Sequence, residues 1–321
     1  MKLRFVHAGL LLALVVAIGV ILRFVPRSPA TVVRAPVLRP LEIIPAGAAF
    51  VLSADLVALR ANPLARRVFA ERLRSLAAAP KGCGLDPVND LDEIVIAVQD
   101  ARALGELDRP FGSGGLAVVA SGKFRTAAVS ECAAASIRAR GGDPVLTPIG
   151  SFVGVRDRKR GGAEIVARDG LLVVSEGTYL RALLDAADGK GAEGGDLERT
   201  RDRLHGELRR RLGDDTPVRA TLSLPPGWLE QTLRDPEASA SPLSKLRSAA
   251  AGVKLGTALS VNALLVSESA ADSAALETVV RSLARDADLG SVSIRSSGVE
   301  LEVRADVPEA AVEALLRAQA D

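Results

Sequence analysis

Residues 163–174 read AEIVARDGLLVV, and this stretch decides the fold class. Two apolar runs of strand length flank Asp169-Gly170, a pair that readily adopts the positive φ angles of a tight turn between antiparallel strands. The sequence therefore predicts a β-hairpin at this position. Residues 179–187, which follow directly, have the spacing of a helix, so strand and helix alternate along the chain.

The same pattern continues outward in both directions from the hairpin. Apolar or alternating runs predict strands at 49–53, 93–98, 116–120, 152–155, 218–224, 256–266 and 299–304. Capping residues and three- or four-residue spacing predict helices at 62–76, 126–138, 197–212, 228–234, 242–250, 276–283 and 308–319. We therefore predict an α+β fold made of two similar mixed sheet-plus-helix units after an N-terminal transmembrane helix.

Composition shifts mark the borders of five segments. They are an N-terminal tail and anchor (1–25), a proline-rich stalk (26–47), a first α+β unit (48–188), a glycine-rich linker with a charged helix (189–216) and a second α+β unit (217–321). Asn62-Pro63-Leu64 and Ser241-Pro242-Leu243 each open a predicted helix after the first strand of a unit. This echo fits an internal duplication, and it also fits the common cap-proline-leucine helix start.

An uncharged apolar run near the start predicts a membrane anchor. Ala8, Leu14, Ile18 and Leu22 lie in this run, which with Phe5 reaches the roughly 18 residues that cross a bilayer as a helix. The alternative is a signal peptide cleaved after residues 28–30, with Lys2 and Arg4 as its basic region. Arg23 and Arg27 lie between the apolar run and that site, which is unusual for a signal peptide, so we expect an uncleaved anchor.

The orientation of the anchor depends on two opposing signals. Positive residues are more numerous after the anchor than before it, which favours a cytoplasmic domain. The very short, charged N-terminal tail is typical of a signal anchor that exports the chain following it. We expect a single-pass inner-membrane protein with a periplasmic domain.

The charge distribution excludes a nucleic-acid binder. The chain has a net charge of +2, and six basic residues precede the first acidic one, Glu42, so the remainder has a net charge of −4. Nucleic-acid binding needs a basic stripe on the folded part, because contacts with phosphates supply most of the affinity.

The two cysteines, Cys83 and Cys132, have two interpretations. In an oxidising compartment they would close a loop of about 50 residues, and such a bridge stabilises a fold by roughly 4 kcal/mol. Otherwise they are two unrelated buried thiols. They form no Cys-x-x-Cys motif, so the sequence gives no support to thiol exchange or a zinc ribbon.

No motif in the sequence predicts a cofactor or a metal. Gly189, Gly191 and Gly194 match G-x-G-x-x-G, but they follow a helix rather than a strand and are better explained as a linker. The acidic run at 86–93 lacks the spacing of an EF-hand and fits turn and capping positions.

Catalytic motifs are equally scarce. Histidine is limited to His7 and His205, and the arginines around His205 predict a solvated helix face rather than a proton shuttle. Trp228 is expected at a core or rim position. The sequence contains 39 acidic residues, and no pair of them can be singled out for carboxylate chemistry. We therefore predict no catalytic, cofactor-binding or metal-binding residues.

An ordered set of short motifs carries a resemblance. The set comprises the anchor, Ile44-Pro45-Ala46, LRANPL at 59–64, CGLDP at 83–87 and Gly122-Lys123-Phe124 before Cys132. This combination resembles anchored envelope proteins of GC-rich bacteria such as myxobacteria. The resemblance implies an exported α+β domain with paired cysteines, and it transfers no activity.

These observations favour a membrane-anchored envelope protein with a non-enzymatic ectodomain that binds a protein, peptidoglycan or lipid partner. One alternative is an envelope hydrolase that uses carboxylates distant in sequence, for which a polar cleft with converging acids would be the sign. Another is a lipid carrier, which would need a continuous apolar cavity.

Overall fold

The computed structural model describes residues 38–45, 47–63, 83, 85–104, 115–190, 205–213, 215–229, 242–256, 259–286 and 291–308. The predicted anchor, with Ala8, Leu14, Ile18 and Leu22, lies outside these residues, as do the C-terminal helix and most of the helix expected at 62–76. Within the described residues, no helix is long and apolar enough to cross a membrane.

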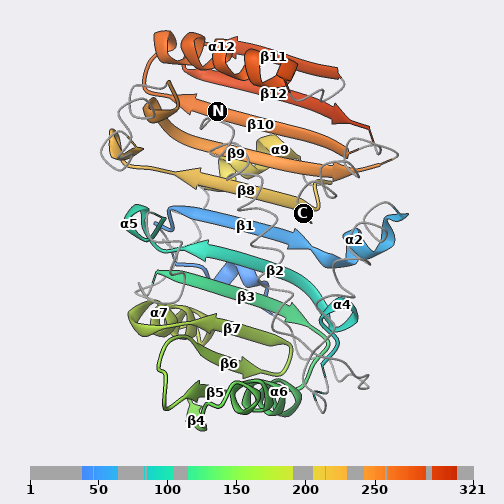
Figure 1. Cartoon of the computed structure of the whole chain (residues 1–321), viewed down its shortest axis with the longest axis vertical. Helices are drawn as coiled ribbons and strands as arrows, with labels where there is room; N and C mark the ends of the chain where they lie inside the picture. The colour runs from blue at the N-terminus through green and yellow to red at the C-terminus, as the bar shows by residue number, and fades with distance from the viewer. Residues whose placement is uncertain are drawn as a thin grey trace.

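The described strands form one sheet of twelve strands in which every neighbouring pair is antiparallel (Figure 1). The strand order is β11-β12-β10-β9-β8-β1-β2-β3-β7-β6-β5-β4. The strands are β1 (Phe50–Asp55), β2 (Leu91–Val98), β3 (Leu116–Gly122), β4 (Pro144–Ile149), β5 (Phe152–Asp157), β6 (Glu164–Arg168), β7 (Leu171–Ser175), β8 (Val218–Ser223), β9 (Leu246–Leu255), β10 (Leu259–Ser267), β11 (Ser291–Ser297) and β12 (Glu300–Val307).

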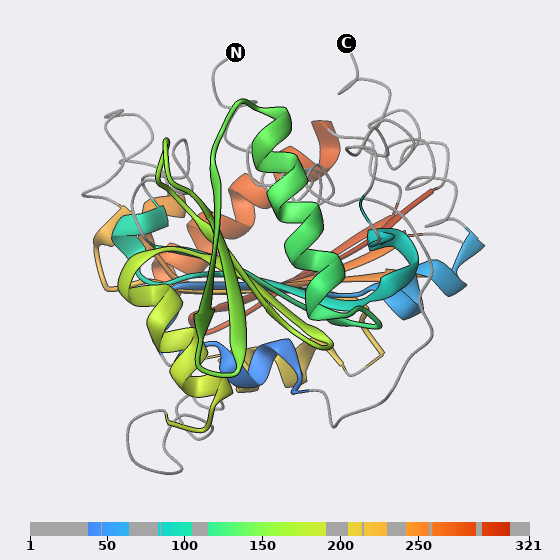
Figure 2. The ribbon, with the colours of Figure 1, turned by 90° about the horizontal axis from the view of Figure 1, so that it is seen from below.

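Helices lie on both faces of the sheet (Figure 2). The long helices α6 and α12 cover one face, and η1, α7 and α9 lie on the other. The helices are η1 (Pro40–Ile43), α2 (Leu56–Ala61), α4 (Pro87–Asp90), α5 (Ala101–Leu104), α6 (Thr126–Ala139), α7 (Gly177–Ala187), α9 (Glu207–Leu212), η3 (Pro242–Lys245) and α12 (Ala270–Asp286). The predicted combination of strands and helices is confirmed.

The first half of the chain, β1 to α7, contains the main core. Successive residues of β2 and β3 alternate between the two faces, so each strand supplies both the cluster under η1 and α7 and the cluster on the opposite face. Val95 and Val119 are completely buried in the former cluster. Tyr179 and Leu183 of α7 complete it, because their four-residue spacing places both on the helix face toward the sheet.

The second half, α9 to β12, has five described strands, against seven in the first half, and the two halves share part of their connection pattern. In the first half, β1, β2 and β3 are neighbours, α6 follows them in the chain, and β7 pairs with β3. In the second half, β8, β9 and β10 are neighbours, α12 follows them, and β12 pairs with β10. The halves join edge to edge through β1 and β8, whose register pairs Ser53 with Arg219. The sheet is therefore continuous across the predicted linker.

The hairpin that decides the fold class is present. Strands β6 and β7 pair from Arg168 and Leu171 outward, and Gly170 has the positive φ, +77°, that the turn requires. The Asp169 carboxylate accepts hydrogen bonds from the Thr126 backbone N–H and hydroxyl, both at 2.8 Å. The turn thereby caps α6.

The prediction of a helix at 242–250 is wrong. Only Pro242–Lys245 is helical, as η3, and the alanine-rich run after it forms β9 between β8 and β10. The small residues of β9 have a packing reason, because a β-carbon at Gly252 would lie 2.8 Å from Thr216 Cγ2 and 3.4 Å from Leu212. Helix α9 thus packs directly on the backbone of β9, and this tertiary contact overrides the helix propensity of alanine.

The folded region also begins earlier than expected. Pro40–Ile43, which the sequence assigns to the stalk, forms η1 on the sheet, and Ile43 and Ile44 are buried in the first-half core. The Glu42 carboxylate accepts a hydrogen bond from the Arg39 backbone N–H, which fixes the start of this turn. The chain is therefore attached to the sheet from Leu38 onward.

Candidate functional site

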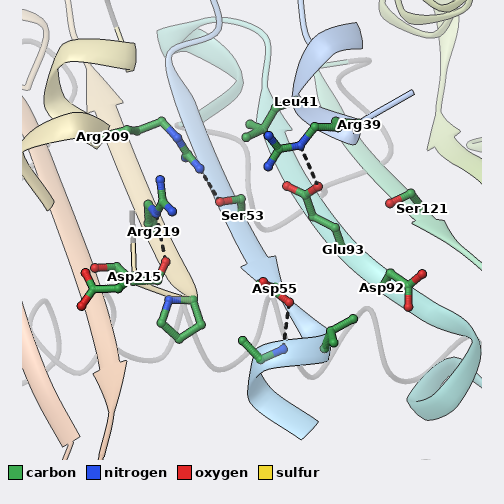
Figure 3. Close-up of a pocket in the computed structure, with 14 residues that line it drawn as sticks. Arg39, Leu41, Ser53, Asp55, Asp92, Glu93, Ser121, Arg209, Asp215 and Arg219 are labelled. Atoms are coloured by element: carbon green, nitrogen blue, oxygen red, sulfur yellow. Dashed lines mark hydrogen bonds and ion pairs between the residues drawn. The ribbon is translucent and has the colours of Figure 1, made fainter. Parts of the chain in front are cut away.

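A pocket of about 380 Å³ lies where the two halves meet (Figure 3). Its floor is formed by β8, β1 and β2, and α9 and η1 stand on either side of it. We call it the junction pocket. A volume of this size matches the lower end of small-ligand sites.

Strand periodicity places the polar floor. In β1, Ser53 and Asp55 face the pocket, whereas Leu52 and Ala54 between them face the core on the opposite side. The register sets Asp55 opposite Glu93 of β2. The register also sets Ser53 opposite Arg219 of β8, so the floor combines side chains from both halves.

The wall contributed by the second half is basic. Arg209 of α9 donates through Nη2 to Ser53 Oγ, and Arg219 of β8 donates through Nε to the Thr216 carbonyl at 2.9 Å. Arg209 Nη1 is buried and has no hydrogen-bond partner among the described residues. Burial, followed by the neighbouring charge of Arg219, lowers the pKa of Arg209 to about 10. Arg209 is therefore a cation that the surrounding protein does not fully compensate.

The wall contributed by β2 is acidic. Burial raises the pKa of Glu93, and the nearby charge of Arg39, whose Nε lies 4.0 Å from Glu93 Oε2, opposes that shift. Asp92 forms an ion pair of 3.3 Å with Arg60.

Asp55, at the end of β1 between the two walls, accepts a hydrogen bond of 2.9 Å from the Ala58 backbone N–H. This hydrogen bond makes Asp55 the N-cap of α2. At the pocket rim, Asp215 pairs with Lys254 at 2.6 Å. The carboxylates of the pocket are thus held in fixed positions.

The sequence did not single out this pocket, although parts of it lie in the acidic run at 86–93. Asp86 and Asn89 hydrogen-bond each other, and the Asp86 backbone N–H donates to Asp90, as expected for turn and capping residues. Asp92 and Glu93 instead face the junction pocket. No group of three or more potential ligands that could hold a metal occurs among the residues that the structure describes.

The expectation of a solvated His205 is wrong. The side chain is only 6% exposed, with Nε2 at 2.7 Å from the Ala48 carbonyl and Nδ1 at 2.8 Å from Thr221 Oγ1. Burial lowers its pKa. The signal that could have revealed this position is the three- and seven-residue spacing from His205 to Leu208 and Leu212, which lie on the apolar side of the helix.

Cys83 and Cys132 are brought together as free, buried thiols. Their side chains are within hydrogen-bonding distance, and burial raises the pKa of both. A disulfide is not formed in the structure, so the bridge stays a prediction.

The other residues singled out by the sequence have structural positions. Gly189 follows α7 with a φ of +71°, whereas Gly191 and Gly194 lie outside the described residues. Trp228 is half-buried and packs against the cluster of Ala49, Ala101 and Leu224, as expected for a rim residue.

The fold has a counterpart among solved structures. Crystal form III of TP0453 superposes with a TM-score of 0.51 at 12% sequence identity and covers 87% of this chain and 98% of that chain. The chain resembles TP0453 in fold. Crystal form I of TP0453 gives a TM-score of 0.48 at 10% identity, covering 88% of this chain and 97% of that chain. No family model and no curated protein matches the sequence.

Proposed function

We propose that this chain is a membrane-anchored protein of the cell envelope whose folded part is a non-enzymatic binding domain, with the junction pocket as its binding site. The observation that carries the proposal is the polar pocket, in which Arg209, Asp55 and Asp92 are each held by a protein partner. Groups fixed before a ligand arrives suit recognition, because less conformational freedom is lost on binding.

The location proposed is the inner membrane, with the domain in the periplasm. The apolar run ending at Leu22 and the resemblance to anchored envelope proteins support it. Leu38 packs against the first-half core. The 15 residues between Leu22 and Leu38 therefore limit the distance from the membrane to the domain to about 50 Å. This limit applies to the edge of the junction pocket as well, because Arg39, the next residue, lines it.

We also propose that the two halves of the sheet are similar units, since each begins with three successive strands and a long helix. The binding site would then be built from both units. A bridge between Cys83 and Cys132 would form in the periplasm, where disulfides persist. The partner would be a protein, peptidoglycan or lipid of the envelope.

The envelope hydrolase is a second candidate, because Asp55, Asp92 and Glu93 line one polar pocket and burial raises the pKa of Glu93. A raised carboxyl pKa is what a general acid needs. Binding is the better explanation, since Asp92 and Glu93 already lie beside arginines, Arg60 at 3.3 Å and Arg39 at 4.0 Å. A hydrolase would lose turnover in Glu93→Gln, whereas a binding protein has no turnover to lose.

Site-directed photo-crosslinking in living cells tests the proposal. Val57 lines the pocket and is 50% exposed, and Leu146 on β4 at the far edge of the sheet is a matched control at 53%. We expect a photoreactive residue at position 57 to give a specific adduct in the membrane fraction, and the same residue at 146 to give none. Equal adducts at both positions, or uncleaved chain recovered as soluble protein without detergent, would contradict the proposal.

A further inference from the structure

The two walls of the junction pocket carry opposite charges that face each other across β1. Arg209 and Arg219 come from α9 and β8 on one side, and Asp92 and Glu93 come from β2 on the other (Figure 3). The boundary between the halves of the chain is thus also a boundary between a basic and an acidic wall.

The walls do not neutralise each other completely. Arg209 uses Nη2 for the neutral Ser53 hydroxyl and keeps Nη1 without an acceptor among the described residues. Glu93 is nearest to Arg39 of η1, at 4.0 Å, which is the outer limit of an ion pair, and 71% of the Arg39 side chain is exposed. A buried charge without a close partner is costly, so Arg209 and Glu93 each gain from a ligand that supplies the missing charge.

The mixture of charges decides the class of ligand. A simple anion would be attracted by Arg209 and Arg219 but repelled by the four carboxylates that line the same cavity, and a simple cation would meet the reverse problem. A small zwitterion avoids both penalties, because its two charges can lie against opposite walls. Arginine also presents parallel N–H donors that suit a carboxylate.

We propose, as an extension that rests on the proposed function, that the junction pocket binds a part of its ligand that carries both a free carboxylate and a free ammonium group, as an α-amino acid does. The carboxylate lies toward Arg209 and Arg219, and the ammonium group lies toward Glu93 and Asp55. Free α-amino acids carry this pair of charges, and so does the side-chain end of a diamino acid that bears its own free carboxylate and ammonium group in a peptidoglycan stem peptide. The ligand is bound without being chemically changed.

Titration calorimetry on the full-length chain in detergent micelles tests the ligand class with three matched probes. Alanine carries both charges, propionate lacks the ammonium group and ethylamine lacks the carboxylate. We expect alanine to bind at least tenfold more tightly than either probe that carries one charge. Soluble muropeptides form a fourth arm: tighter binding than alanine identifies peptidoglycan as the source, and weaker binding identifies the free amino acid.

Variants test the assignment of the walls. Arg219→Gln and Glu93→Gln should each weaken alanine binding at least tenfold. Arg211→Gln is the matched control on α9, because Arg211 pairs with Glu300 and Glu302 outside the pocket, and it should leave the affinity unchanged. Circular dichroism of each variant should match that of the parent chain, which separates loss of binding from loss of fold.

The results that would contradict the zwitterionic ligand differ from those that would contradict the binding function. Propionate binding as tightly as alanine, or alanine binding unaffected by Glu93→Gln, would refute the zwitterion while leaving a binding pocket in place. Absence of alanine and muropeptide binding, together with a specific crosslink at position 57, would likewise refute only the ligand class. If the crosslink is absent as well, the proposed function fails with it.

Discussion

The two halves of the sheet each begin with three successive strands and a long helix, but they differ in how completely they are buried. In the first half, Val95, Ala97 and Val119 are fully buried between helices on both faces. In the second half, most residues of β9 and β10 are only half-buried, and among the described residues its own buried cluster is small, comprising Leu212, Ala250 and Leu264. The described parts of the two halves therefore have cores of different size.

This difference indicates where the stability of the molecule resides. Burial of apolar surface contributes about 25 cal/mol per Å², so the first half supplies most of the hydrophobic free energy. The second half is joined to it through β1 and β8 and through His205. We expect the first half to set global stability and the second half to unfold more easily.

The largest effect should come from truncating matched leucines in the two halves. Leu171 on β7 is 1% exposed and belongs to the main core, whereas Leu265 on β10 is half-buried. We expect Leu171→Ala to lower the free energy of unfolding by about 3 kcal/mol and Leu265→Ala by about 1 kcal/mol. Urea unfolding followed by circular dichroism measures both. Equal losses would show that the halves do not differ as their burial indicates.

The connection between the halves is tested at His205. Leucine at this position leaves the Ala48 carbonyl and the Thr221 hydroxyl without their imidazole partner, so we expect a loss of about 1–3 kcal/mol at pH 8. Hydrogen exchange should show the larger increase in the amides of β8 and β9. A variant as stable as the parent chain would show that the buried imidazole does not stabilise the connection.

His205 also predicts a pH dependence. Burial lowers its folded-state pKa, so on acidification the unfolded chain takes up the proton first. This contribution to stability is complete above the unfolded value of about 6.5 and is lost as the pH falls below it. His205→Leu should lack this step. Unfolding of both chains between pH 8 and pH 5 measures it, and parallel curves would contradict the assignment.

Next in size are the two hairpin glycines, one in each half. Gly170 and Gly298 both have positive φ, and a β-carbon at Gly298 would meet no atom within 4 Å. Gly298→Ala should therefore cost only the backbone strain, about 1 kcal/mol. The Gly170 backbone N–H also donates to the Phe124 carbonyl at 3.0 Å, in the segment before α6, so backbone strain in Gly170→Ala should weaken this hydrogen bond as well and cost more. Thermal unfolding compares the two, and a greater loss at Gly298 would reverse the comparison.

The sequence predicted those parts of the fold in which local signals and tertiary packing agree. The hairpin at Asp169-Gly170 and the apolar strands β2 and β3 are such cases. Strand β9 could not be predicted, because its run of alanines favours a helix unless α9 packs against it. The order of strands across β1 and β8 depends on contacts between residues far apart in sequence, which periodicity does not report.

The candidate site was less predictable than the fold. Asp92 and Glu93 were noticed as acidic residues, but the arginines that face them across the pocket, on α9 and β8, follow them by more than a hundred residues. Arg209 belongs to a run of arginines whose composition resembles a solvated helix. Only the docking of α9 on β9 determines which of these arginines enters the pocket.

The smallest expected effect concerns Arg211, which connects α9 to β12 within the second half. Its guanidinium pairs with Glu300 at 2.7 Å and Glu302 at 3.0 Å, and all three side chains are about one-third exposed or more. Solvent weakens such pairs, so Arg211→Ala should cost at most about 1 kcal/mol and less at high salt. Urea unfolding at low and high salt measures this difference. A loss as large as that of Leu171→Ala would mean that surface charges, rather than burial, hold the second half together, and the contrast between the halves would then be one of mechanism rather than of core size.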